Sequence, residues 1–108
     1  MEKHLQQILA LNKLRQEMLS VSVEMFGYSI NISLSQNGGA SAIELAERDG
    51  GFNVCLVDEN FPLIELVSLF ISFDEIESID ARKILYANRS VFNEHKKLHN
   101  LLVKKEAK

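Results

Sequence analysis

The sequence predicts an α+β fold, in which a small antiparallel β-meander is flanked by an N-terminal helix and a long C-terminal helix. Apolar residues recur at helical spacing near both ends of the chain, whereas the middle alternates apolar and polar residues and contains two Gly-Gly pairs. The length of 108 residues and the hydrophobic content of 46% are ordinary for one globular domain. We therefore assign residues 1–108 to a single domain with three strands, and a fourth if residues 61–73 are extended.

The first helix is expected over residues 2–25. Its apolar side chains are spaced alternately three and four residues apart and so share one face, at Leu11, Leu14, Met18, Val21 and Met25. Gly27 follows as a C-terminal cap, because glycine readily takes the left-handed conformation that ends many helices. In an alternative, Ser20 to Phe26 alternate as a short strand and the helix ends near Leu19.

Three strands are expected to form the meander. Residues 28–36 show the clearest alternation of apolar and polar side chains, and residues 41–48 and 52–58 follow as the second and third strands. Asn37-Gly38-Gly39 and Asp49-Gly50-Gly51 are predicted to be the tight turns between them, because Asn, Asp and Gly accept positive φ. Such a meander would present one apolar and one largely polar face.

Residues 61–73 fit two structures. As a helix they place Leu63, Leu66, Val67 and Phe70 on one face, and Pro62 suits the first turn. As a strand they would be unusually long and apolar on both faces, although their β-branched and aromatic content favours that structure. We favour the helix over a fourth strand.

The terminal helix is expected over residues 75–104, with a break near Ser78 as an alternative. The acidic run Asp74-Glu75-Ile76-Glu77 precedes it, and negative charge at a helix start is favourable for the helix dipole and for capping. We therefore interpret this run as a helix start and not as a pair of catalytic carboxylates.

Charge is divided unequally along the chain. Residues 1–80 carry 4 basic and 13 acidic side chains, whereas residues 81–108 carry 8 basic and 2 acidic ones, within a net charge of −3. On one continuous helix, six cations would form a basic stripe beside the apolar face: Arg82, Lys83, Arg89, Lys96, Lys97 and Lys104. This stripe is the candidate partner-binding site, and we expect it to meet acidic protein groups in preference to nucleic acid, because nucleic-acid-binding modules are usually basic overall.

Reactive side chains are sparse. His95 and His99 are four residues apart, the spacing at which two imidazoles share a metal on a helix, but no further ligand pattern supports them, so they are weak metal candidates. Cys55 is the one cysteine, which excludes an internal disulfide, and no base lies near it in sequence, so we expect a small buried hydrophobe and not a nucleophile. Neither Gly-Gly pair matches a nucleotide-binding pattern. We predict no catalysis and no cofactor.

The expected compartment is the cytoplasm. Met1-Glu2-Lys3-His4 lacks the build of an export signal, and the longest apolar-rich run, Phe61 to Phe73, is too short for a membrane span. No membrane association is therefore expected.

The function that the sequence favours is a non-catalytic protein-binding module, of adaptor, secretion-chaperone or inhibitor type. Two long helices carry more apolar surface than a small sheet covers, and such surface is typical of self-association or a partner groove, so we expect a homodimer. The alternative is a nucleic-acid-associated dimer that uses the basic stripe. The helix, three strands, helix order is similar to that of the YbaB-type nucleoid-associated proteins, without a shared motif.

Overall fold

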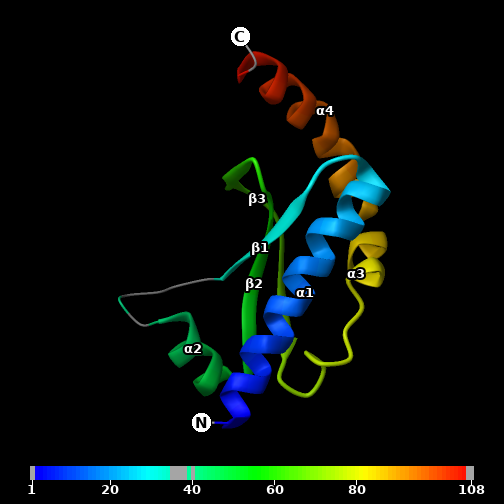
Figure 1. Ribbon diagram of the computed structural model, residues 1–108. Coiled ribbons are helices and arrows are strands. Elements are labelled where there is room, and N and C mark those ends of the chain that lie inside the picture. The colour runs from blue at the N-terminus through cyan, green and yellow to red at the C-terminus, as the bar shows by residue number, and fades with distance from the viewer. Residues whose placement is uncertain (1, 35–38, 40, 107–108) are drawn as a thin grey trace.

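Four helices and three strands make up the part of the chain that the structure describes. The computed structural model describes residues 2–34, 39 and 41–106. Its elements are α1 (Glu2–Phe26), β1 (Ile30–Leu34), α2 (Ala42–Asp49), β2 (Gly51–Asp58), β3 (Phe61–Ser72), α3 (Ala81–Ala87) and α4 (Arg89–Glu106) (Figure 1). The α+β prediction is confirmed, since a three-stranded antiparallel sheet is flanked by an N-terminal and a long C-terminal helix.

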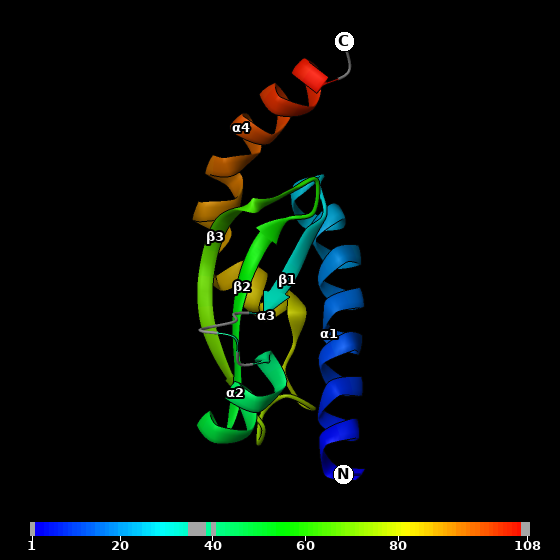
Figure 2. The ribbon, with the colours of Figure 1, turned by 90° about the vertical axis from the view of Figure 1, so that its left-hand side faces the viewer.

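The sheet is a meander in the order β1-β2-β3, with both pairs antiparallel. The register aligns Ile32 with Leu56 and Leu56 with Val67, so apolar side chains share one face of all three strands. α1 and α3 lie on this side of the sheet, whereas α2 lies toward the viewer in Figure 2. Buried residues from α1, the strands and the terminal helices form one core: Leu11, Leu14, Met18, Ile30, Leu56, Leu85 and Phe92. Burial of this continuous apolar surface is the main force holding the layers together.

A tight corner joins α1 to β1. The helix ends at Gly27, as predicted, where φ is +85° and the backbone N–H donates to the Val23 carbonyl over 2.9 Å. Inside the corner, the buried Ser22 hydroxyl donates to the Leu19 carbonyl and accepts from the Ile30 N–H over 2.8 Å. The alternative strand over Ser20 to Phe26 is wrong, because the helix continues through these residues.

The second predicted strand is wrong, because residues 42–49 form the helix α2. The side chain of Ser41 accepts from the Glu44 N–H as an N-cap, and Gly50, with φ +77°, donates to the Ala46 carbonyl as a C-terminal cap. Asp49-Gly50-Gly51 therefore ends a helix and is not a hairpin turn. Of the other predicted turn, Asn37-Gly38-Gly39, the first two residues lie outside the described ones. Because α2 lies between β1 and β2 in the chain, the predicted order of one helix, three consecutive strands and one helix, which is similar to that of the YbaB-type proteins, is not observed.

The preference for a helix at residues 61–73 is also wrong, because the segment is the strand β3. The chain turns between Asp58 and Phe61 and runs back antiparallel to β2, with Ile71 opposite Phe52 and Val67 opposite Leu56. Pairing with β2 satisfies the backbone, and the β-branched content fits a pleated surface. β3 is thus the third strand of the sheet, whereas the second strand that we had expected at 41–48 is absent from that position.

The long terminal helix is interrupted twice. Residues 73–78 form turns, in which the Glu75 carboxylate accepts from the Ser72 N–H over 3.0 Å, so the acidic run caps a turn and does not begin the helix. The helix begins at Ala81 instead, where the Asp80 side chain accepts from the Arg82 N–H. At Asn88 the chain changes direction, and its side chain donates to the Ile84 carbonyl. α3 and α4 are consequently separate helices.

Candidate functional site

A buried carboxylate and two buried imidazoles form the densest polar cluster among the described residues. Asp58 ends β2, and His95 and His99 lie on successive turns of α4. The Asp58 Oδ2 atom is 2.9 Å from His95 Nε2 and 2.6 Å from His99 Nδ1. Asp58 has no exposed surface, and both histidines are buried. We call these three residues the Asp58 cluster.

The Asp58 cluster has its hydrogen-bonding groups oriented by neighbours. Asp58 Oδ1 accepts from the Asn60 N–H over 3.0 Å, which fixes the carboxylate, while Oδ2 is left to face both imidazoles. A carboxylate only accepts, so in this arrangement each imidazole donates an N–H to it. The cluster joins the end of the sheet to α4 through two hydrogen bonds of a kind that is strong in a buried environment.

Aromatic rings hold the imidazoles in place. The Tyr28 ring stacks on His99 with centroids 4.6 Å apart, and Phe61 meets the same imidazole edge-on at 5.9 Å. The Tyr28 hydroxyl donates to the Phe92 carbonyl over 2.6 Å. Burial, together with the charge of Asp58, raises the pKa of this hydroxyl above its usual value. Tyr28 is therefore held as a neutral donor at physiological pH.

Sequence reasoning identified His95 and His99 but missed Asp58. The pair was judged weak because no third ligand was apparent, yet the fold brings Asp58 to it across 37 residues of sequence. The available signal was a charged residue at the end of an otherwise apolar strand, Phe52 to Val57, since a buried charge is retained only with a partner.

The six cations of the basic stripe do not lie on one helix, because Arg82 and Lys83 belong to α3 and the other four to α4. All six are exposed. Arg82 pairs with Glu24 over 2.7 Å, and the Arg89 guanidinium lies 4.1 Å above the centre of the Tyr86 ring. Within the described part of the chain no ion pair is formed by the other five. Among the described residues, pairing of the stripe with carboxylates of the same chain is thus limited to Arg82.

Cys55 is buried in β2, as expected, and its thiol is free. Burial raises the pKa of the thiol, with a smaller contribution from the negative charge of Glu65. The thiol lies 4.0 Å from the Leu56 carbonyl oxygen, whereas both imidazoles of α4 are hydrogen-bonded to Asp58. A protonated, enclosed thiol is a poor nucleophile at neutral pH.

Two apolar surfaces remain exposed at the β3 side of the molecule. β3 is an edge strand of twelve residues in which Glu65 is the one charged residue, and Leu63 is 96% exposed. On α4, Val91, Leu98 and Leu101 are exposed, whereas Phe92, His95 and His99 form a buried line. We call these exposed residues of α4 the apolar flank.

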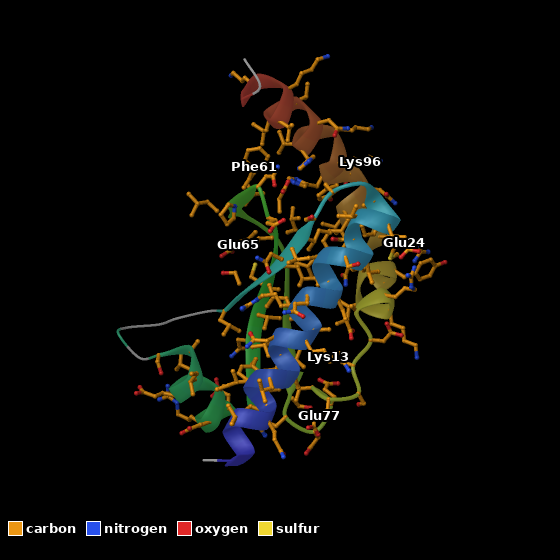
Figure 3. All side chains as sticks on the ribbon, viewed as in Figure 1. Lys13, Glu24, Phe61, Glu65, Glu77 and Lys96 are labelled. Atoms are coloured by element: carbon orange, nitrogen blue, oxygen red, sulfur yellow. The ribbon has the colours of Figure 1, made fainter. Side chains whose placement is uncertain are left out.

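Figure 3 shows how the flanks of α4 are oriented. Phe61 and Lys96 lie on opposite sides of the helix, and a Cβ atom added to Gly27 would lie 3.5 Å from Lys96 Nζ. Lys96 therefore faces the end of α1. At 100° per residue, Val91 and Leu98 lie on the other side of the buried line from Lys96, which is the β3 side. Val91 and Leu98 of the apolar flank consequently lie on the side of the edge strand, and Leu101 lies about 60° farther round the helix.

Comparisons with protein-family models, with curated proteins and with solved structures found no match to this chain. Among the helices of the described residues, none is both long enough and apolar enough to cross a membrane. Function has therefore to be argued from the surfaces and the buried cluster themselves.

Proposed function

We propose that this chain is a non-catalytic protein-binding module of the cytoplasm, and that it works as a homodimer joined through the β3 edge and the apolar flank of α4. The observation that carries the proposal is the outer edge of β3. β3 pairs with β2 on one side, and the sheet order places no strand of the described chain on its other side. An edge of this kind presents backbone N–H and C=O groups that can pair with another chain.

Edge strands of monomers are usually protected from such pairing by charge, proline or shortness. β3 has twelve residues, and its proline, Pro62, and its charged residue, Glu65, both lie in the first half. Residues 67–72 pair regularly with β2 and carry no charge at all. This half of the edge is therefore well suited to continue the sheet into a partner.

The apolar flank extends this surface beyond the sheet. The distal half of α4 projects past the strands in Figures 1 and 2, so it has few neighbours in its own chain. Leu101 is 66% exposed there, and Leu98 is exposed one turn earlier. Apolar surface on a projecting helix is stabilised by a partner that covers it.

A second copy is the occupant that fits the charge distribution. Residues 1–80 carry a large acidic excess and residues 81–108 a basic one, yet within the described residues Arg82 alone of the stripe pairs with a carboxylate. In a two-fold dimer the basic α4 of each copy would lie near the acidic residues 1–80 of the other copy. An acidic protein could use the same cations once the dimer is formed, which is how the module would bind its target.

The test compares two matched double variants by sedimentation velocity over a range of micromolar concentrations. Leu63→Lys with Leu101→Lys places two charges on the proposed interface. Leu5→Lys with Leu9→Lys makes the same chemical change on α1, where both leucines are 57% exposed. Every replaced side chain is largely exposed, so both variants are expected to fold, and circular dichroism checks this.

The proposal predicts that the wild type and the α1 variant sediment as dimers, and that the Leu63 and Leu101 variant dissociates at least tenfold more readily. Dissociation caused by the α1 variant alone would place the interface elsewhere. A wild type that remains monomeric at all concentrations would remove the dimer from the proposal.

A further inference from the structure

We propose that the Asp58 cluster is a binding site for a divalent transition-metal ion of the Zn²⁺ type, with Asp58 Oδ2, His95 Nε2 and His99 Nδ1 as ligands. The three atoms lie within 4.8 Å of one another, and they are contributed by two elements far apart in sequence. The inference is independent of the proposed dimer, because it rests on buried residues and not on the exposed surface.

The donor set selects the class of metal. Two imidazole nitrogens and one carboxylate oxygen are ligands of Zn²⁺, Co²⁺ and Ni²⁺, whereas Mg²⁺ and Ca²⁺ prefer oxygen alone. Three protein ligands leave one position of a tetrahedral ion for water. His99 is the least enclosed of the three, with 11% of its side chain exposed, so solvent reaches the cluster at this residue.

The present distances are close to those of a metal site without being equal to them. Bonds of 2.0–2.1 Å at a tetrahedral ion place neighbouring ligand atoms about 3.3 Å apart. Asp58 Oδ2 is 2.9 Å and 2.6 Å from the two nitrogens, so binding requires each imidazole to withdraw from this oxygen by less than about 0.8 Å. The two nitrogens, which lie within 4.8 Å of one another, must at the same time approach each other toward that spacing. Each imidazole must also carry its hydrogen on the other ring nitrogen, so the ion replaces both N–H donors to Asp58.

The groups around the ligands are those that hold a metal site in shape. The Asn60 N–H fixes the far oxygen of Asp58, and Tyr28 and Phe61 enclose the His99 ring from two directions. Such neighbours reduce the reorganisation that binding requires. An ion would also compensate the negative charge of a carboxylate that has no exposed surface.

The first experiment titrates Co²⁺ and then Zn²⁺ into the untagged full-length chain after dialysis against a chelator. We expect one Co²⁺ per chain with visible absorption typical of a tetrahedral site, displaced by one equivalent of Zn²⁺. Long-range ¹H–¹⁵N spectra should show Zn²⁺ on Nε2 of His95 and on Nδ1 of His99. At a hundredfold excess over its Kd, Zn²⁺ should raise Tm by about 10 °C.

Variants assign the ligands. Asp58→Asn keeps the shape and a hydrogen-bond acceptor, so it is the variant best able to fold, and His99→Gln tests the second element. Each should weaken Zn²⁺ binding by more than the 10–100-fold typical of losing a neighbour of a ligand. His4→Gln is the matched control, since His4 is the one histidine outside the cluster, and it should leave the affinity unchanged.

The wild-type spectra decide the question even if both cluster variants fail to fold. Absence of saturable Co²⁺ or Zn²⁺ binding at micromolar concentrations would overturn the proposal. So would spectra in which His95 and His99 keep their metal-free shifts while Zn²⁺ binds elsewhere, or a folded Asp58→Asn variant with the affinity of the wild type. In those cases the cluster is a hydrogen-bonded tie between β2 and α4 only.

Discussion

Replacing Tyr28 by Phe should remove one hydrogen bond and leave the aromatic packing intact. The Tyr28 hydroxyl donates to the Phe92 carbonyl over 2.6 Å in a buried position. Phe92 lies within α4, so its carbonyl also accepts from the helical N–H four residues later and keeps a partner in the variant. The cost is therefore that of a net hydrogen bond, about 1 kcal/mol, and not the larger cost of an orphaned carbonyl.

The expected change is measurable by thermal unfolding. A chain of 108 residues has an unfolding entropy of about 0.23 kcal/mol/K, so 1 kcal/mol corresponds to about 4 °C in Tm. Tyr86→Phe is the control, because Tyr86 is exposed on α3 and its ring contact with Arg89 does not need the hydroxyl. A Tm for Tyr28→Phe within 1 °C of the wild type would refute the role given to this hydrogen bond.

Alkaline unfolding gives a second measurement on the same pair of variants. Burial and the charge of Asp58 raise the pKa of Tyr28 in the folded chain above its usual value of 10.0. The unfolded chain therefore releases this proton first, and stability falls as pH rises above about 10, by up to about 1.4 kcal/mol per pH unit. Tyr28→Phe should lose stability less steeply than the wild type in that range, whereas Tyr86→Phe should follow the wild type.

Three further predictions concern separate parts of the chain. Gly51→Ala should destabilise the fold by about 2 kcal/mol in urea titrations, because the added Cβ would overlap the Ile71 carbonyl and lie 2.7 Å from the Ser72 Cα. A variant as stable as the wild type would mean that β2 and β3 can separate at this position at no cost. Near physiological salt we expect negligible nucleic-acid binding, both by the wild type and by a variant in which the charges of Arg89 and Lys96 are reversed. A salt-sensitive submicromolar affinity of the wild type that these reversals abolish would instead support the nucleic-acid alternative. Cys55 should react with a thiol reagent only as fast as the chain unfolds, and rapid labelling of the native protein would contradict its burial.

The sequence predicted the elements whose periodicity is strong and missed those decided by tertiary context. α1 was predicted nearly to its last residue, because its apolar face repeats at helical spacing from Leu11 to Met25 and Gly27 ends it. α2 was missed although Ser41 and Glu44 have the spacing of a capping pair, because the neighbouring glycines were read as hairpin turns. β3 was only the less favoured of two alternatives, because a long apolar segment gives no clear period, and its pairing with β2 decides its conformation.

The Asp58 cluster, too, could be predicted from the sequence only in part. The four-residue spacing of His95 and His99 was visible, since both residues belong to one helix. Asp58 joins them only because the antiparallel meander brings the end of β2 under α4. Likewise, the basic stripe was predicted from a single helical wheel, and the break at Asn88 divides it between two helices. Contacts between elements are not encoded in local spacing.

Hydrogen–deuterium exchange of the wild-type chain at nanomolar and micromolar concentrations tests the proposed edge pairing most directly. If a second copy pairs with β3, amides over residues 67–72 should become more protected as concentration rises, because their exposed N–H groups gain partners. β1 is the opposite edge of the sheet and serves as the internal reference, so its protection should stay constant. Protection of β3 that is low and independent of concentration, or a rise confined to β1, would contradict dimerisation through β3.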